Sequence, residues 1–218
     1  MTLKAISFTP EVLKAKLRAL EEYGRCMTRR RIGGTVAPNQ WPATERGDGR
    51  VWVDPAHEYG WVRPPFGLLG QRLWIRERAL VTKFLPFTDS GPKVTLRYEV
   101  DGAESGWVAY PPRLREPRVG HCVPNGVHRD GARHFLEVVE VRAERAADIS
   151  VHDAMLDGVE LYGSRQSDGA LLFGLHGSGR INFPSARAAY FALYDSIYGA
   201  GAHVCEWVWV YTLKRAGP

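Results

Sequence analysis

Four short runs of apolar, β-branched and aromatic residues limit the folds open to this chain. Residues 73–75 and 94–98 are bounded by glycine or proline, as strands usually are. Residues 135–141 are mostly apolar on both faces, which is typical of a strand inside a sheet or barrel. Residues 207–213 carry large side chains with a period of two. We expect all four runs to share one barrel or strongly curved sheet.

Three short helices are predicted beside these strands, and each has a capping residue and a glycine stop. The caps are Thr9, Ser150 and Ser185. The stops are Gly24, Gly158 and Gly199. Interleaved strands and short helices predict an α+β fold.

Two stretches rich in glycine and proline, about 33–70 and 101–131, are predicted to be long loop insertions, with a small hairpin near 51–53. The chain has 218 residues, of which 44% are hydrophobic and 24% charged, so wholesale disorder is excluded. The simplest organisation is one domain over residues 1–218.

Composition also bears on location. No run approaches the length of a transmembrane helix, and the first residues lack the apolar stretch of a secretory signal. We therefore expect a cytoplasmic protein without a membrane partner. The three cysteines are widely spaced, which excludes a disulfide framework or a CxxC zinc site.

The positive charge is concentrated near the start of the chain. The net charge is +5, and residues 1–35 alone account for all of it. Half of the basic residues in this segment are arginines close together, at Arg25, Arg29, Arg30 and Arg31. Localised positive charge favours a phosphate-bearing partner, although a solvated arginine cluster without a ligand is the alternative.

Several segments, in order, resemble the ASCH domain family, and its phage-encoded branch in particular. Residues 25–30 resemble the family's Lys-Thr-Gln-Thr-Arg-Arg signature, and residues 70–77 resemble its Gly-Asp-x-Leu-Trp-Val-Arg-Glu strand. Residues 136–159 resemble its Leu-Glu-Val, Asp-Ile-Ser and Ala-x-x-Glu-Gly-Val block. Residues 191–197 and 207–211 resemble its terminal helix and strand. The matches are short, and they are spread over most of the chain from Gly24 to Leu213.

This resemblance implies a PUA-like architecture, a small β-barrel flanked by short helices, here with two long loop insertions. It also implies a cleft that holds RNA or a modified base. For a phage-encoded protein, the location would be the host cytoplasm.

A smaller ASCH branch is an amidohydrolase that removes the acetyl group from N4-acetylcytidine. Its catalytic Thr, Lys and Glu correspond to Thr28, Arg25 and Asp157 of this chain, so two of the three have changed. If the alignment shifts by one residue, Cys26 takes the lysine position. Arginine cannot accept a proton as a lysine with a lowered pKa can, and Asp157 is one methylene shorter than glutamate. The hydrolase interpretation is weakened accordingly.

A nucleic-acid site is the stronger interpretation of the same segment. Arginine suits phosphate and can stack on a base, so Arg29 and Arg30 are expected to contact phosphate or base. Thr28 would donate a hydrogen bond to the ligand, while Asp157 and Glu77 would line or brace the pocket. Glu77 could instead form a structural ion pair with Arg29 or Arg30. The full predicted set is Arg25, Thr28, Arg29, Arg30, Trp74, Glu77 and Arg129.

Two other motifs are candidates for cofactor or metal sites, and neither matches a known pattern. His121, Cys122, His128 and His134 match no zinc pattern. The glycine-rich stretch 176–179 matches neither dinucleotide nor P-loop spacing. We therefore predict neither a metal nor a cofactor.

The sequence favours a module that binds a single-stranded or modified nucleotide in a barrel cleft, with RNA preferred over DNA. The first alternative is a small amidohydrolase acting on N4-acetylcytidine or a related acylated nucleoside. The second is a phage assembly or interaction protein.

Overall fold

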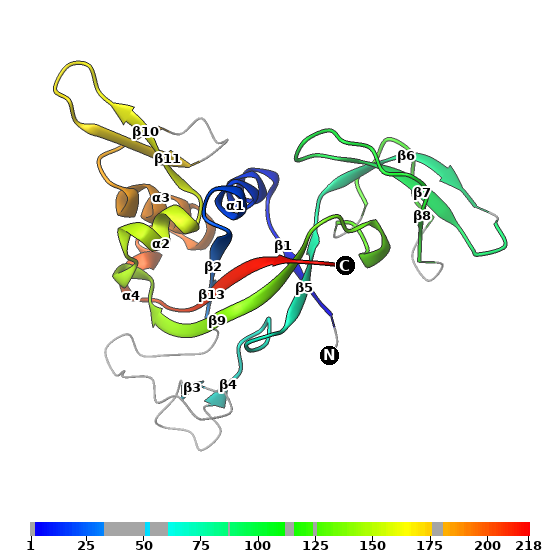
Figure 1. The fold of residues 1–218 in the computed structure, drawn as a ribbon, viewed down its shortest axis with the longest axis horizontal. Coiled ribbons are helices and arrows are strands. Elements are labelled where there is room, and N and C mark those ends of the chain that lie inside the picture. Colours follow the sequence, from blue (N-terminus) through cyan, green and yellow to red (C-terminus); the bar gives the residue numbers. More distant parts are fainter. Residues whose placement is uncertain are drawn as a thin grey trace.

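The structure is a computed structural model that describes residues 3–32, 51–52, 61–86, 88–111, 116–123, 126–175 and 181–218. Most of the predicted insertion 33–70, parts of the loop 101–131 and the glycine-rich stretch 176–179 lie outside the described residues. What is described is a mixed α+β fold in which sheets predominate (Figure 1).

A five-stranded sheet forms the centre of the fold. In spatial order its strands are β1 (Lys4–Ser7), β5 (Arg72–Arg76), β9 (Phe135–Arg145), β13 (Trp207–Ala216) and β2 (Arg25–Arg31). β1 and β5 are parallel, and the other pairs are antiparallel. Three of the four predicted runs therefore share one sheet, and the third run, in β9, lies in its centre as expected.

The two edges of this sheet approach each other. A guanidinium nitrogen of Arg30, on the edge strand β2, donates to the carbonyl oxygen of Ser7, on the opposite edge strand β1, at 3.1 Å. No backbone pairing joins the two edges within the described residues. The sheet is thus strongly curved, and it is not a closed barrel.

Residues 94–98 form a strand as predicted, but the prediction that this strand joins the central sheet is wrong. They form β7 (Lys93–Tyr98) in a separate three-stranded sheet with β6 (Ala79–Leu85) and β8 (Val108–Ala109). β6 and β7 are neighbours in the chain, so they satisfy their backbone groups by local antiparallel pairing. A period of two identifies a strand, but it does not identify the strand's partner.

Two smaller sheets complete the strands. β10 (Val159–Ser164), β11 (Leu171–Leu175) and β12 (Ile181–Phe183) form an antiparallel sheet whose hairpin projects from the molecule (Figure 1). β3 (Val51–Trp52) pairs with β4 (Trp61–Val62), in agreement with the hairpin predicted near residue 51.

The helices begin where their caps predict. They are α1 (Pro10–Glu22), α2 (Val151–Leu156), α3 (Ala186–Tyr198) and α4 (Ala202–Cys205), with 3-10 turns η1 (Arg129–Gly131) and η2 (Ala146–Asp148). The side chains of Thr9, Ser150 and Ser185 accept the capping hydrogen bonds from backbone N–H groups of α1, α2 and α3. These bonds satisfy donors that a helix leaves unpaired at its start.

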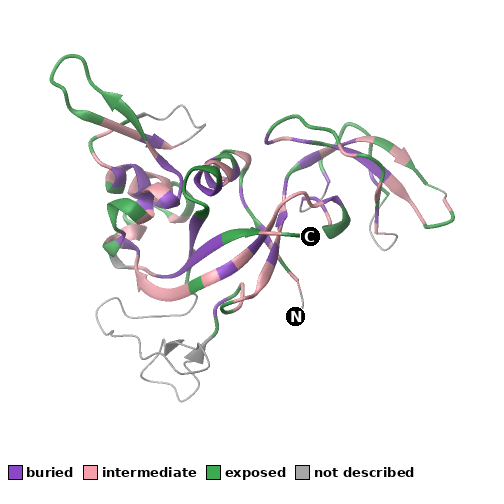
Figure 2. Ribbon diagram, in the orientation of Figure 1, coloured by how far each residue is buried: buried purple, intermediate pink, exposed green. Residues whose placement is uncertain are grey.

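Apolar clusters cover both faces of the central sheet. On β13, Trp209, Tyr211 and Leu213 join the cluster that contains α1 and the β6–β7–β8 sheet. Val208 and Val210 join the cluster that contains α2 and α3. Because both faces are covered, β13 is buried along most of its length (Figure 2).

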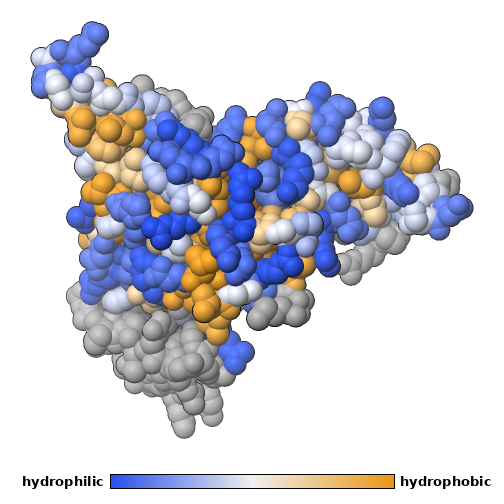
Figure 3. All heavy atoms as spheres, viewed as in Figure 1, coloured by the Kyte–Doolittle hydropathy of each residue, from blue (hydrophilic) through white to orange (hydrophobic). Residues whose placement is uncertain are grey.

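The outer surface is varied in character. On the face seen in Figure 3, hydrophilic and hydrophobic residues are interspersed over the described elements. Within the part of the chain that the structure describes, no helix has both the length and the apolar character needed to cross a membrane.

Candidate functional site

Arg29, on the edge strand β2, is the centre of a buried charge network. Its side chain is 1% exposed and contacts three carboxylates. It is 2.8 Å from Glu144 Oε1 and 3.2 Å from Asp153 Oδ2, and it also donates to Asp157 Oδ2. The guanidinium lies 5.4 Å from the centre of the Tyr190 ring. Its charge is therefore compensated inside the protein.

Lys16, on α1, completes this network from the other side. Its side chain is 2% exposed, and its Nζ is 2.5 Å from Asp157 Oδ1 and 2.7 Å from the Asp157 backbone oxygen. One buried carboxylate thus receives a lysine and an arginine from different elements. This arrangement ties α1, β2 and the end of α2 together.

The two cations control the protonation of Asp157. Burial by itself would raise the pKa of this carboxyl, but Lys16 and Arg29 hold the pKa below its ordinary value. Asp157 is therefore a carboxylate at neutral pH, and both of its oxygens are occupied by donors. A carboxylate in this state is a weak base.

A cavity of about 50 Å³ lies beside the network. Its polar lining consists of Lys16, Thr28, Arg29, Arg30, Asp157, Tyr190, Tyr194 and Tyr198. The structure thus brings Thr28, Arg29, Arg30 and Asp157 together, as expected for the predicted site. Burial raises the pKa of Tyr190 and Tyr194, so both phenols remain protonated. The cavity can take a small group, but it is too small for a whole nucleotide.

Arg30 faces away from this carboxylate network. Its guanidinium donates to Thr28 Oγ1 at 2.8 Å and to the Ser7 oxygen at 3.1 Å. It lies over the rings of Phe8 and Phe66, at 5.3 and 5.4 Å from their centres. It forms no ion pair with a carboxylate of the described residues, and although burial lowers its pKa, an arginine stays charged. Arg30 is a half-buried, uncompensated cation at the gap between β1 and β2.

The other predicted catalytic residues are outside the cavity. Arg25 is exposed, and one of its guanidinium nitrogens is 3.4 Å from His152 Nε2. Cys26, the alternative at the same position, belongs to the apolar core, where burial raises the pKa of its thiol to about 12. A thiol with that pKa is neither a ligand nor a nucleophile at neutral pH.

The remaining predicted binding residues belong to other surroundings. Glu77 is buried and pairs with Arg133, at 2.5 Å, rather than with Arg29 or Arg30. The half-buried Trp74 lies below Arg76, whose guanidinium carbon is 5.5 Å from the centre of the indole. Arg129 is exposed on η1 and does not line the cavity.

Lys16 and the three tyrosines of α3 were missed by sequence reasoning. A signal for Lys16 exists, because it lies three residues after Leu13 and four before Leu20, on the apolar side of α1. A lysine at such a position must either pair with an anion or bury its charge in an apolar core, which costs free energy. The signal for the tyrosines is weaker, since aromatic residues on one helix face most often belong to a core.

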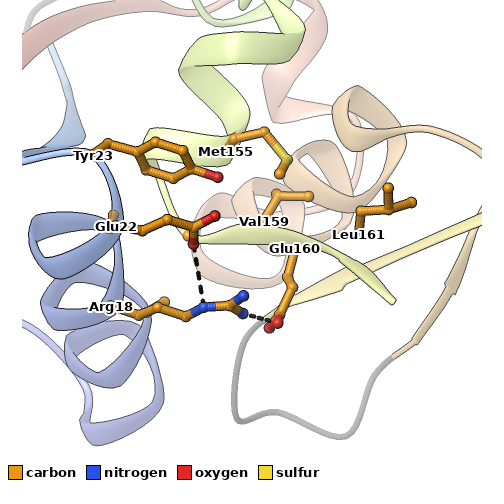
Figure 4. Close-up of a pocket in the computed structure, with 10 residues that line it drawn as sticks. Arg18, Glu22, Tyr23, Met155, Val159, Glu160 and Leu161 are labelled. Atoms are coloured by element: carbon orange, nitrogen blue, oxygen red, sulfur yellow. Dashed lines mark ion pairs between the residues drawn. The ribbon is translucent and has the colours of Figure 1, made fainter. Parts of the chain in front are cut away.

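A second hollow, of about 220 Å³, lies between α1 and the start of β10 (Figure 4). Met155 and Val159 contribute to its apolar lining. Arg18 reaches across its rim between Glu22 and Glu160, so this cation is compensated (Figure 4). The hollow lacks the combination of free charge and hydroxyl group that marks the Arg30 gap.

No protein-family model, curated protein or solved structure matches this chain.

Proposed function

We propose that this protein binds single-stranded nucleic acid, with the phosphate of one nucleotide held by Arg30 at the gap between β1 and β2. The proposal rests on one observation, namely the set of groups that surround the Arg30 guanidinium. A guanidinium that lacks a carboxylate partner in the described structure, beside the Thr28 hydroxyl, offers donors to phosphate or to a base edge. The Phe8 and Phe66 rings fix its plane. The preference for RNA over DNA rests on the family resemblance.

The fold that accompanies this function is proposed to be a PUA-like barrel opened at the same gap. Two features support it, namely the order of the ASCH-like segments along the chain and the curvature that brings β1 within reach of β2. In this arrangement the Arg30 side chain would link the two edges of the barrel and would also contact the ligand.

The geometry gives the two neighbouring arginines different roles. Arg29 is enclosed by Asp157, Glu144 and Asp153, so a phosphate would have to displace a carboxylate to reach it. Arg30 carries the phosphate contact, and Arg29 supports the strand that positions it. One phosphate contact at this gap is therefore expected where the sequence alone indicated two.

We expect Arg30→Ala to weaken binding of a fluorescein-labelled oligouridylate and to flatten its salt dependence. A single-strand phosphate contact contributes about −0.7 to the slope of log K against log salt, so the slope should decrease by about that amount. Thr28→Ala should weaken binding with an unchanged slope, because a hydroxyl releases no counterions. Fluorescence anisotropy at several salt concentrations measures both quantities.

Arg97→Ala is the matched control, because Arg97 is exposed on β7 and does not line the gap. Arg113 and Arg115, in the predicted loop insertion 101–131, lie outside the described residues and are not used as controls. Arg30→Lys should retain the slope while losing part of the affinity, since lysine keeps the charge without the planar fork. A folded Arg30→Ala protein with wild-type affinity and slope would rule out this site.

One observation favours amide hydrolysis as a second candidate function. Lys16 supplies the amine that Arg25 cannot, and it shares the cavity with Thr28 and Asp157. A hydroxyl, an amine and a carboxylate are the groups that such a reaction uses. The reaction would add water across the amide of N4-acetylcytidine and release acetate and cytidine.

We nevertheless expect little or no turnover of N4-acetylcytidine by the wild-type protein. Both oxygens of Asp157 are occupied by Lys16 and Arg29, and among the described residues no hydrogen bond links Thr28 to either Lys16 or Asp157. A threonine without a positioned base is a poor nucleophile. An absorbance assay on the nucleoside measures the rate. Robust turnover that both Thr28→Ala and Lys16→Met abolish would establish the enzyme instead.

A further inference from the structure

A larger cleft lies next to the Arg30 gap. Its volume is about 620 Å³, which is within the range of sites that hold drug-sized ligands. Ser7, Phe8 and Thr9 line one side, while Arg76, Arg78 and Cys122 line the other. Ser7 ends β1, and Phe8 and Thr9 connect it to α1. Arg76 ends β5, Arg78 follows it, and Cys122 lies between β8 and η1.

The sequence of β5 explains why a cation points into this cleft. Ser7 and Arg76 are register partners in the parallel β1–β5 pair, so both residues lie at the same end of the sheet. Leu73 and Ile75 are buried, while Trp74 and Arg76 lie on the opposite face. A Cβ atom added at Gly126 would be 2.7 Å from Arg76 Cγ, so the arginine stem is closely packed there. The packing restrains the start of the Arg76 side chain, and the residue lines the cleft.

The charge of the cleft is only partly compensated. Arg76 forms no ion pair with any described residue, and it lies over the Trp74 ring. Arg78 is 58% exposed and is 3.3 Å from Glu99. Glu99 also accepts a hydrogen bond from the Cys122 thiol at 3.1 Å, which occupies part of its acceptor capacity. Two guanidinium groups therefore face a volume large enough for a nucleotide.

The cleft and the gap share two residues. Ser7 accepts the hydrogen bond from Arg30, and Phe8 lies beneath the Arg30 guanidinium. Both residues also line the cleft. A strand with one nucleotide at Arg30 would thus have its neighbour at the mouth of the cleft.

We propose that this cleft is a second nucleotide subsite, in which Arg76 and Arg78 contact the phosphate that follows the nucleotide at Arg30. The inference rests on the proposed function, and it gives the bound strand a path across the molecule from Thr28 past Phe8 to Arg78. It also predicts that affinity depends on ligand length. A mononucleotide can occupy only one of the subsites, whereas a short oligonucleotide can occupy both.

The test compares uridine monophosphate with a hexauridylate by competition against a labelled oligouridylate at several salt concentrations. Arg76→Met and Arg78→Met should each weaken hexauridylate binding about tenfold, the effect of losing one charge-assisted contact. Each should change binding of the monophosphate at Arg30 by less than about twofold. Because both arginines contact the same phosphate, the double variant is expected to reduce the hexauridylate salt slope by about 0.7 in total. Methionine keeps the apolar stem, so the packing against Gly126 is retained. Arg97→Met is the control.

The outcomes separate the two proposals. A folded wild-type protein that binds no hexauridylate overturns the proposed function. Hexauridylate binding that Arg30→Ala weakens, but that neither methionine variant changes, overturns the second subsite alone. Equal losses for the monophosphate and the hexauridylate would also overturn it, because the cleft would then be the primary site. If Arg76→Met does not fold, the exposed Arg78 decides between these results.

Discussion

Asp157→Asn is expected to lower the free energy of unfolding by about 3–5 kcal/mol, the cost of removing one partner from a buried ion pair. Asparagine has nearly the same shape as aspartate, so the effect comes from charge. The change would leave Lys16 and Arg29, with side chains 2% and 1% exposed, without their shared carboxylate. Domains of this kind are typically stable by about 5–15 kcal/mol, so the loss is a large fraction of the total. Urea denaturation followed by tryptophan fluorescence measures it.

Asp153→Asn is the matched control for this prediction. Asp153 also contacts Arg29, but it lies closer to solvent and shares the half-buried Arg142 with Glu140 and Glu144. Its replacement should cost about 1 kcal/mol or less. Adding Lys16→Met to Asp157→Asn should recover part of the stability, because it removes one of the two stranded cations. Equal effects of Asp153→Asn and Asp157→Asn would contradict the special role of the buried carboxylate.

The pH dependence of unfolding gives a second readout of the same pair. The pKa of Asp157 is lower in the folded protein than the value of about 3.9 expected in an unfolded chain. Its contribution to stability is therefore complete above that value and is lost as the pH falls through the folded pKa. The Asn variant should lose less stability than the wild-type protein between neutral and strongly acidic pH.

β5, β9 and β13 of the central sheet could be predicted because they are rich in apolar and β-branched residues, whereas β1 and β2 were not predicted as strands. β13 is apolar at most positions and buried on both faces, and few structures other than an inner strand accommodate such a pattern, whereas the buried residues of β9, Leu136 and Val138, lie on one face. The starts of the capped helices could also be predicted, since a capping hydrogen bond joins residues only about three positions apart. The error at β7 had a different origin, because strand pairing depends on the whole chain.

The site was only partly predictable for the same reason. The family resemblance pointed to Thr28, Arg30 and Asp157, which the structure brings into one cavity. It could not show that Arg29 meets Glu144 and Asp153, which are more than a hundred positions away in the chain. A run of arginines looks the same in sequence whether its partner is a ligand or a buried carboxylate.

Gly158→Ala is expected to destabilise the protein by about 2–5 kcal/mol. Gly158 directly follows Asp157 and has a φ of +105°, where a side chain costs roughly 1–2 kcal/mol. A Cβ atom there would be 2.4 Å from the Cβ of Ala15 on α1, so α1 and the end of α2 would be forced apart. Overpacking of this kind adds about 1–3 kcal/mol. The separation would also strain the pair between Lys16 and Asp157.

Two further variants separate the backbone effect from the clash, because the two causes add in Gly158→Ala. Gly24 has a φ of +69°, but an added Cβ would meet nothing within 4 Å, so Gly24→Ala should show only the backbone cost. Ala15→Gly should cost about 1 kcal/mol alone, since glycine disfavours a helix. Combined with Gly158→Ala, it removes the clashing methyl group, and the cycle should give a favourable coupling of at least about 1 kcal/mol. Simple additivity in urea denaturation would mean that the close approach of α1 to Gly158 does not limit stability, and the backbone conformation alone would then explain the glycine.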